Sequence, residues 1–133
     1  MIVMSATGIH VYLPPGGAPS PTQLDGKFLQ ISWRGRDHLL FAPKSLHRYH
    51  NQMLAQFLAE HGIAHHWASD QQLDVDDPEL RIHGGGRFRA DAIRRELTLW
   101  DNSQAYGRFD AERAVGQIAA ADHAWSAYRV VVD

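Results

Sequence analysis

The sequence predicts a single domain of the α+β, or mixed α/β, sandwich class. Roughly five to seven segments have the alternating or β-branched pattern that is typical of strands. Two longer segments repeat apolar residues with the period of an amphipathic helix. A chain of 133 residues can bury a core without disulfides, and this one contains no cysteine. We therefore expect one domain over residues 1–133.

The N-terminal segment, residues 1–24, is expected to be largely irregular. One strand is predicted over 9–13, where the β-prone alternation is typical of a sheet edge. Residues 14–21 hold four prolines and two glycines, so they should form a loop that cannot join a central sheet. The core is therefore expected to occupy residues 25–132.

A hairpin and a helix should open this core. Between Tyr49 and His61 the apolar residues share one helical face, and Gly62 is typical of a residue that ends a helix. Ser45 is a candidate N-cap, and the helix should begin between residues 45 and 50. The hairpin strands are predicted over 28–33 and 38–42.

The second half of the chain should supply the remaining strands and a second helix. Ser69–Pro78 is rich in Asp and Gln and is expected to be an exposed loop. Asp110 can cap the second helix, whose apolar positions are Ala111, Ala114, Val115, Ile118 and Ala119. The remaining strands are predicted over 63–68, 79–83, 95–101 and 127–132.

Composition narrows the classes of function. The formal charge of -2, from 13 basic and 15 acidic residues, gives no general attraction for nucleic acid. Without cysteine the chain has no disulfide, zinc–thiolate site or cysteine nucleophile. No apolar run approaches the ~18 residues of a membrane span, so we expect no membrane association and a cytoplasmic location.

Two glycine-containing segments predict an anion-binding pocket. Gly84–Gly86 is followed at once by Arg87, and three glycines can turn backbone N–H groups toward one point. Ser103–Gly107 lies between a predicted strand and a predicted helix, where helix N-terminal amides favour anions. Neither segment has the pattern of a Walker P-loop or of a dinucleotide site. Alternatively, the three glycines only mark a bend where strands approach closely.

His50 is the candidate for chemistry in that pocket. It projects near the middle of the apolar helix face and should point at the protein body. A neutral imidazole could act there as a general base at pH 7, whereas the alternative is a core histidine without chemistry. A metal site is a further alternative, since His47 and His50 are three residues apart and His61, His65 and His66 lie close together. No carboxylate has a matching spacing and Gly62 breaks the helix between His61 and His65, so we expect no metal site.

Together these motifs resemble the small protein phosphohistidine phosphatases and the related Janus/Ocnus proteins. Members of that family have Tyr-His at the start of a long amphipathic helix, then Gly-Gly-Gly-Arg-Ile, then Ser-x-Ala-Tyr-Gly. The corresponding residues here are Tyr49-His50, Gly84–Phe88 and Ser103–Gly107, in the same order. The resemblance covers residues 25–132 approximately.

The resemblance implies a mixed β-sheet packed between two main helices, and a phosphatase that needs neither a metal nor another cofactor. Its catalytic residue would be His50. Phosphate would be bound by the backbone amides of Asn51 and Ala105 and by the side chains of Arg87 and Ser103. The substrate would be a phosphorylated protein or a small phosphoramidate, and we expect the protein to be a monomer.

Two positions depart from the family pattern. The family's strand lysine aligns with Leu29, although Lys27 lies two residues earlier on the same strand face. The family's arginine before the histidine aligns near Ala42, with Lys44 close by. Lys27 and Lys44 are thus the candidate substitutes for these charges. The segment 63–78 is also longer than in the family, and its acidic residues favour a solvated loop over a lid that contacts phosphate.

Two main hypotheses of function follow. The first is metal-independent hydrolysis of phosphohistidine, or of a related small phosphoramidate or phosphate ester, with His50 as general base or nucleophile. The alternative is a non-catalytic module of the same fold that binds phosphate or a phosphorylated ligand. A third hypothesis is a regulatory or structural protein with a vestigial pocket.

Overall fold

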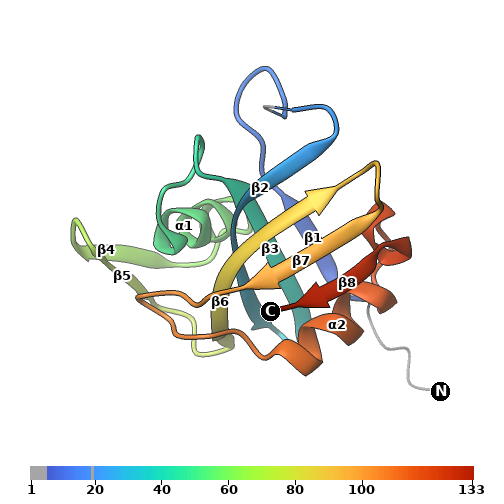
Figure 1. Cartoon of the computed structure of the whole chain (residues 1–133). Helices are drawn as coiled ribbons and strands as arrows, with labels where there is room; N and C mark the ends of the chain where they lie inside the picture. Colours follow the sequence, from blue (N-terminus) through green and yellow to red (C-terminus); the bar gives the residue numbers. More distant parts are fainter. Residues whose placement is uncertain (1–5, 19) are drawn as a thin grey trace.

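A six-stranded mixed sheet forms the centre of the computed structural model, which describes residues 6–18 and 20–133 (Figure 1). The two outermost pairs are parallel and the inner pairs are antiparallel. In spatial order the strands are β1 (Gly8–Val11), β3 (Arg36–Pro43), β2 (Gln23–Trp33), β6 (Leu80–Asp91), β7 (Glu96–Trp100) and β8 (Arg129–Val132). Residues 1–5 and 19, part of the segment expected to be irregular, lie outside the described residues.

Two helices and a second, two-stranded sheet complete the fold. The helices are α1 (His50–Glu60) and α2 (Ala111–Ala120), and a short 3-10 helix, η1 (Ala124–Ala127), precedes β8. The second sheet is a hairpin of β4 (His65–Ser69) and β5 (Gln72–Val75). These elements confirm the predicted α+β class. No helix in the described ranges is long and apolar enough to cross a membrane.

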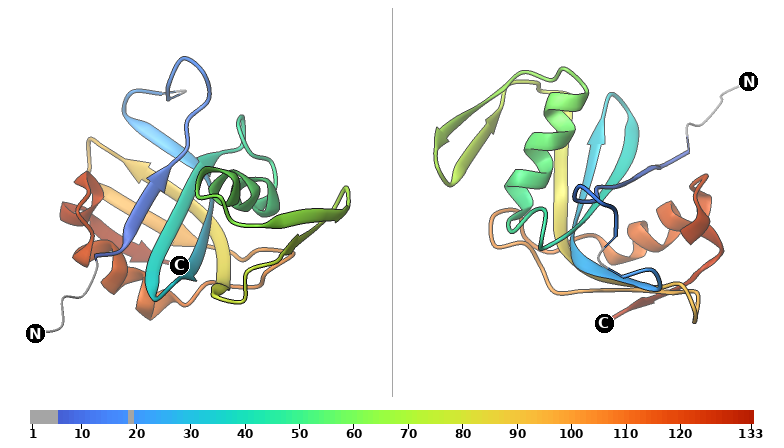
Figure 2. Two further views of the ribbon diagram at one scale, coloured as in Figure 1. Left: turned by 180° about the vertical axis from the view of Figure 1, so that it is seen from behind. Right: turned by 90° about the horizontal axis from the view of Figure 1, so that it is seen from above.

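Alternation along β2 builds one core on each face of the sheet. Phe28 faces α2 and belongs to the same cluster as Ile118. The next residue, Leu29, faces α1 and packs in the cluster that contains Phe57. Each such fully buried side chain stabilises the fold by roughly 1.5–3 kcal/mol. The two helices consequently lie on opposite sides of the sheet (Figure 2, right).

The three consecutive glycines lie inside strand β6, and not in an anion-binding loop as the first interpretation had it. All three pair with residues of β2, and the Gly85 N–H donates to the carbonyl of Gly107 at 3.0 Å. Gly84 has a φ of 140°, and a Cβ there would lie 2.3 Å from the carbonyl oxygen of Arg108. Close approach of neighbouring backbones, the alternative interpretation, therefore explains this glycine.

The segment 69–78, expected to be a loop, contains strand β5. Ser69 pairs with Gln72, so only Asp70 and Gln71 form the tip of the hairpin. Leu73 and Val75 pack at the border of the core under α1. The prediction was wrong here because most of this hairpin is exposed on both faces, so its polar residues hide the strand pattern.

Of the two predicted N-caps, the one at α2 is present and the one at α1 is not. Asp110 caps α2, and its carboxylate accepts a hydrogen bond from the Arg113 N–H at 3.1 Å. Helix α1 is preceded by Tyr49 and not by Ser45; the Tyr49 N–H donates to the Gln52 side chain at 3.1 Å. The reciprocal reach of a first-turn glutamine back to the cap thus replaces the expected serine cap.

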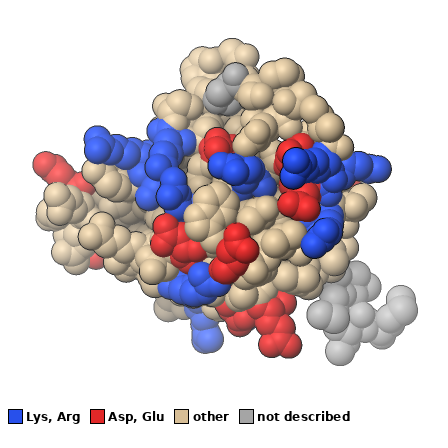
Figure 3. Space-filling model, in the orientation of Figure 1, with Lys and Arg blue, Asp and Glu red and all other residues tan. Residues whose placement is uncertain are grey.

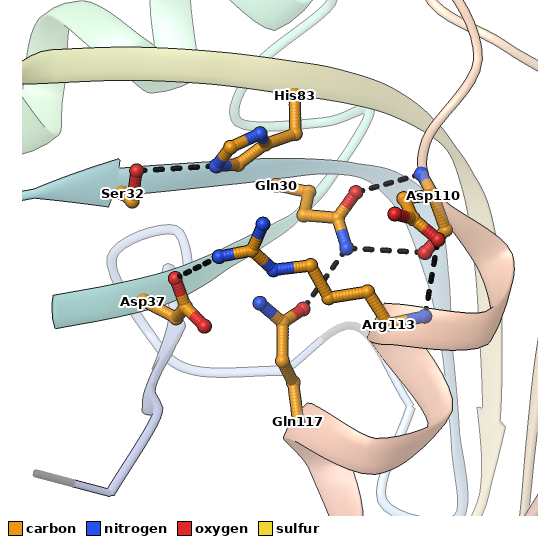
Figure 4. Close-up of polar contacts among 7 residues, drawn as sticks. All are labelled: Gln30, Ser32, Asp37, His83, Asp110, Arg113 and Gln117. Carbon is orange, nitrogen blue, oxygen red and sulfur yellow. Dashed lines mark hydrogen bonds and ion pairs between the residues drawn. The ribbon is translucent and has the colours of Figure 1, made fainter. Parts of the chain in front are cut away.

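A buried amide network ties α2 to the sheet (Figure 4). The fully buried Gln30 donates from Nε2 to the Asp110 carbonyl and to Oε1 of Gln117, at 3.1 and 2.9 Å. Its Oε1 accepts from the Asp110 N–H at 2.8 Å. The predictions that Val115 and Ala119 are core positions of α2 were wrong, because both residues are exposed. Gln117 is buried instead, and its Oε1 accepts the bond from Gln30.

Candidate functional site

The start of α1, the tip of the β4–β5 hairpin and the loop after β7 enclose a cavity of about 410 Å³. We call it the His50 cavity. Most of the candidate site residues line it, and they come from segments far apart in the chain, which the sheet brings together. The lining residues are Lys27, Tyr49, His50, Asn51, Asp70, Gln71, Ser103, Gln104 and Ala105.

The His50 side chain packs against the sheet, and one of its two ring nitrogens forms a hydrogen bond to it. Its side chain is only 4% exposed, and Nε2 lies 3.0 Å from the carbonyl oxygen of Gly86. Because a carbonyl can only accept, Nε2 must carry the proton in the neutral ring, which leaves the lone pair on Nδ1. Nδ1 makes no hydrogen bond to another described residue, and it is not among the buried polar atoms without a partner. Because His50 lines the cavity, we infer that Nδ1 is accessible from it.

Gly85 makes room for this histidine. A Cβ at position 85 would lie 2.8 Å from Cδ2 and 2.9 Å from Nε2 of the His50 ring. Any side chain would therefore push the ring out of its place. The middle glycine of the run thus serves the candidate site by letting an imidazole pack directly on the strand backbone.

The surroundings keep His50 neutral. Burial, more than any other cause, lowers the pKa of His50 below its usual value of 6.5, and the positive charge of Lys27 lowers it further. The hydrogen bond to Gly86 opposes these effects. Burial also lowers the pKa of Lys27, helped by the charges of Lys44 and Arg87. At pH 7 the imidazole of His50 is therefore predominantly neutral, with one ring nitrogen unprotonated.

The Ser103–Gly107 loop presents an amide to the cavity. Ser103 and Gly107 exchange two backbone hydrogen bonds, at 2.9 and 2.8 Å, and close the loop on itself. The Ser103 hydroxyl oxygen accepts from the Tyr106 N–H at 3.2 Å, and its own hydrogen stays available as a donor. Ala105 lines the cavity, and its backbone N–H bonds to no described residue.

The first turn of α1 presents a second amide. Asn51 is the second residue of the helix, and its N–H has no acceptor among the described residues, as expected for a first-turn amide. The Asn51 side chain donates to the carbonyl of Gln71 at 3.2 Å. This bond ties the hairpin tip to the helix start, so the hairpin forms one wall of the cavity.

Arg87 and Lys44 do not line the His50 cavity. They line a neighbouring cavity of about 290 Å³, together with Trp100. We call this the Arg87 cavity. Arg87 lies directly opposite Lys27 in the β2–β6 ladder, so the two cavities adjoin at this pair. The structure thus brings five predicted residues together (Lys27, His50, Asn51, Ser103 and Ala105) and places the other two next door.

The two positions where the family resemblance would require a charge are buried and apolar. Leu29 and Ala42 are both fully buried in the core under α1. Ala42 pairs with Lys27 across the β2–β3 ladder. Lys27 lies on the same face of β2 as Leu29, as predicted, and it reaches the cavity edge that Leu29 cannot reach.

The other histidines that were considered as metal ligands each bind a different partner. His47 bonds to the Gln56 side chain, His61 to the carbonyl of Phe57, and His65 to the carbonyl of Ile63. His66 lies between two carboxylates of β5 and its flank. Within residues 6–18 and 20–133 no group of three or more His, Asp or Glu side chains is arranged to hold a metal ion.

Sequence reasoning missed the hairpin tip. Asp70 and Gln71 line the His50 cavity, although the segment was expected to be a solvated loop apart from the site. The signal that could have found them is the alternation of Leu73 and Val75 after a polar turn, which is typical of the second strand of a hairpin.

In comparisons with known proteins, no family model matches the chain and the search of curated proteins finds no match.

Proposed function

We propose that this protein is a metal-independent phosphatase with the phosphohistidine-phosphatase type of fold, acting on phosphohistidine or a small phosphoramidate. One observation carries the proposal: His50, whose Nδ1 has no partner among the described residues, lines a cavity together with Asn51 and Ala105, whose backbone N–H groups have no acceptor among them. Free amides at a helix start and in a tight loop are suitable ligands for phosphoryl oxygens. Lys27 adds the one cation of the cavity lining.

The proposed chemistry uses these groups in defined roles. The amides of Asn51 and Ala105, the Ser103 hydroxyl and Lys27 would hold the phosphoryl oxygens and stabilise negative charge in the transition state. Nδ1 of His50 would take a proton from a water whose oxygen attacks phosphorus, while the P–N bond breaks and the leaving nitrogen gains a proton. Alternatively, Nδ1 would attack phosphorus itself while the P–N bond of the substrate breaks and the leaving nitrogen takes a proton from water. A second water would then hydrolyse the resulting phosphohistidine and restore the free imidazole.

Hydrolysis of phosphoramidate at pH 7 without added metal tests this proposal. We expect the His50→Ala variant to lose about 10²- to 10⁴-fold in rate while it still binds inorganic phosphate. The matched control is His47→Ala, whose imidazole bonds to Gln56 and does not line the cavity, and which should keep its activity. Equal rates in wild type and folded His50→Ala would refute a role for His50.

A second candidate function is a phosphate-binding module without catalysis. It is favoured by the buried, uncharged Leu29 and Ala42, which remove two cations that the resemblance would place at the site. Such a module would bind inorganic phosphate at the Asn51 and Ala105 amides and release no phosphate from phosphoramidate over hours. The wild-type hydrolysis assay therefore separates the two functions.

A further inference from the structure

The Arg87 cavity is a second hollow that the proposed chemistry leaves unused. It adjoins the His50 cavity at the Lys27–Arg87 pair of the β2–β6 ladder. Directly opposite residues in such a ladder have Cβ atoms roughly 4.5–5.5 Å apart. The lining residues are Asp25, Gly26, Pro43, Lys44, Ser45, Arg87, Phe88, Arg89 and Trp100.

The cations at this border outnumber their partners. Among the described residues, neither Lys44 nor Arg87 has a carboxylate within ion-pair distance. Arg89 has one, Asp25, at a long 3.7 Å between two exposed side chains, a contact of little strength. Burial lowers the pKa of Lys27, and the nearby positive charges of Lys44 and Arg87 lower it further. Unpaired like charges gathered in one hollow favour an anionic occupant.

Trp100, which lines the Arg87 cavity, contacts one of these cations. The guanidinium carbon of Arg87 lies 5.6 Å from the centre of the Trp100 ring, a cation–π contact that restrains a long side chain. An arginine stacked in this way keeps its N–H edge free for two-point recognition of a carboxylate or phosphate. Lys and Arg side chains lie close together on this face, toward the loop that follows β3 (Figure 3).

We propose that the Arg87 cavity is a substrate subsite for a second anionic group, carried next to the phosphorylated residue of a peptide. This inference rests on the proposed function, because it assumes that the His50 cavity holds the phosphoryl group. The anionic group is a carboxylate or a second phosphoryl group. In an extended peptide, side chains two residues apart on one face are roughly 6.6 Å apart, which suits two adjoining cavities.

The test compares three peptides that differ at one position. Each carries a non-hydrolysable phosphohistidine mimic, and two residues further on it carries Gln, Glu or phosphoserine. We expect wild type to bind the Glu or the phosphoserine peptide about 3- to 10-fold more tightly than the Gln peptide, as for a charge-assisted contact. The Lys44→Gln variant should lose most of that preference. Arg34→Gln is the matched control, because Arg34 pairs with Glu79 and does not line either cavity, and it should keep the preference.

Each outcome bears on the proposal. Equal affinity of wild type for all three peptides would overturn it, as would a preference that Lys44→Gln retains. A preference for phosphoserine alone identifies the group as a second phosphoryl, and a preference for both admits either anion. Because the readout is equilibrium affinity, the preference can be present even if phosphoramidate hydrolysis fails, so the subsite and the proposed function can be refuted separately.

Discussion

The imidazole of His50 occupies the space that a side chain at position 85 would need. The two groups come from different elements, since His50 opens α1 and Gly85 lies within β6. Contact at the bare glycine backbone allows Nε2 to reach the carbonyl of Gly86, and this bond determines which ring nitrogen is free. The identity of the residue at 85 and the protonation of His50 are therefore linked.

Gly85→Ala should displace the His50 ring. The added methyl would lie under 3.0 Å from two ring atoms and from the carbonyl oxygen of Phe28. We expect a loss of about 1–3 kcal/mol in the free energy of unfolding, together with loss of phosphoramidate hydrolysis. Gly116→Ala is the control, because Gly116 lies in helix α2 and a Cβ added there would meet nothing within 4 Å beyond the local helix backbone. The Gly116→Ala change should raise the free energy of unfolding by up to ~1 kcal/mol. If Gly85→Ala left both stability and activity unchanged, the close packing of His50 on Gly85 would be disproved.

The pH dependence of hydrolysis should report a neutral His50. Because burial and Lys27 lower the pKa of His50, its unprotonated form dominates at pH 7 and is lost only as the pH falls through a value below 6.5. We expect kcat/KM to fall on the acid side with a midpoint below 6.5. NMR titration of the His50 ring should give the same midpoint in the free enzyme.

Lys27→Met provides the matched variant for that titration. Removal of the ammonium charge should raise the pKa of His50, since Lys27 lowers it. A pKa of His50 at or above 6.5 in wild type, or one that does not rise in Lys27→Met, would disagree with the electrostatics described above.

Gln30 should be essential for anchoring α2. Gln30→Met keeps a similar volume but leaves the Asp110 N–H and Oε1 of Gln117 without their partner. We expect a loss of about 2–4 kcal/mol, measured by urea denaturation. Asp37→Asn, which breaks an exposed ion pair with Arg113 in the same region, should cost less than about 1 kcal/mol (Figure 4). Similar losses in the two variants would argue against the buried network.

Stability should fall in mild acid because of His38. Burial lowers the pKa of His38 to about 4, helped by the charges of His10, Arg36 and His61, while Asp37 opposes the shift. Between pH 6.5 and about 4 the unfolded chain binds a proton at His38, whereas the folded chain does not. The contribution of His38 to the free energy of unfolding is therefore largest above pH 6.5 and decreases as the pH falls toward about 4. The decrease should reach up to about 3 kcal/mol.

His38→Gln should flatten that decrease in denaturation experiments between pH 7 and 4. The control is His66→Gln: this exposed histidine has its pKa raised by Asp76, so its removal cannot reduce a loss of stability in acid. If the free energy of unfolding of His38→Gln decreased as steeply with falling pH as that of wild type, groups other than His38 would cause the loss of stability in acid.

Local patterns in the sequence were sufficient to predict much of the fold. Periodicity located both helices and placed His50 on the buried face of α1, and alternation placed Lys27 on the same strand face as Leu29. These predictions hold because a repeat of 3.6 or 2 residues depends on the chain's own geometry. The N-cap of α2 was equally local, since Asp110 reaches only three residues ahead.

What was missed depends on contacts between distant segments. The glycine run suggested a loop, because nothing local shows that Gly85 packs on His50 and that Gly84 packs on the backbone at Arg108. Likewise, nothing local shows that Arg87 lies opposite Lys27 and lines a second cavity, because the strand register determines that position. Register is a property of paired strands, so no reading of one segment alone could supply it.

We propose that the start of α1 and the Ser103–Gly107 loop form one anion site beside His50. Titration of the 15N-labelled protein with inorganic phosphate, followed by amide NMR, tests it directly. We predict that the signals of Asn51 and Ala105 shift together with one dissociation constant, and that the His50 ring signals follow them. Shifts confined to other amides, or Asn51 and Ala105 signals that stay in place at saturating phosphate, would show that these two amides do not bind phosphate.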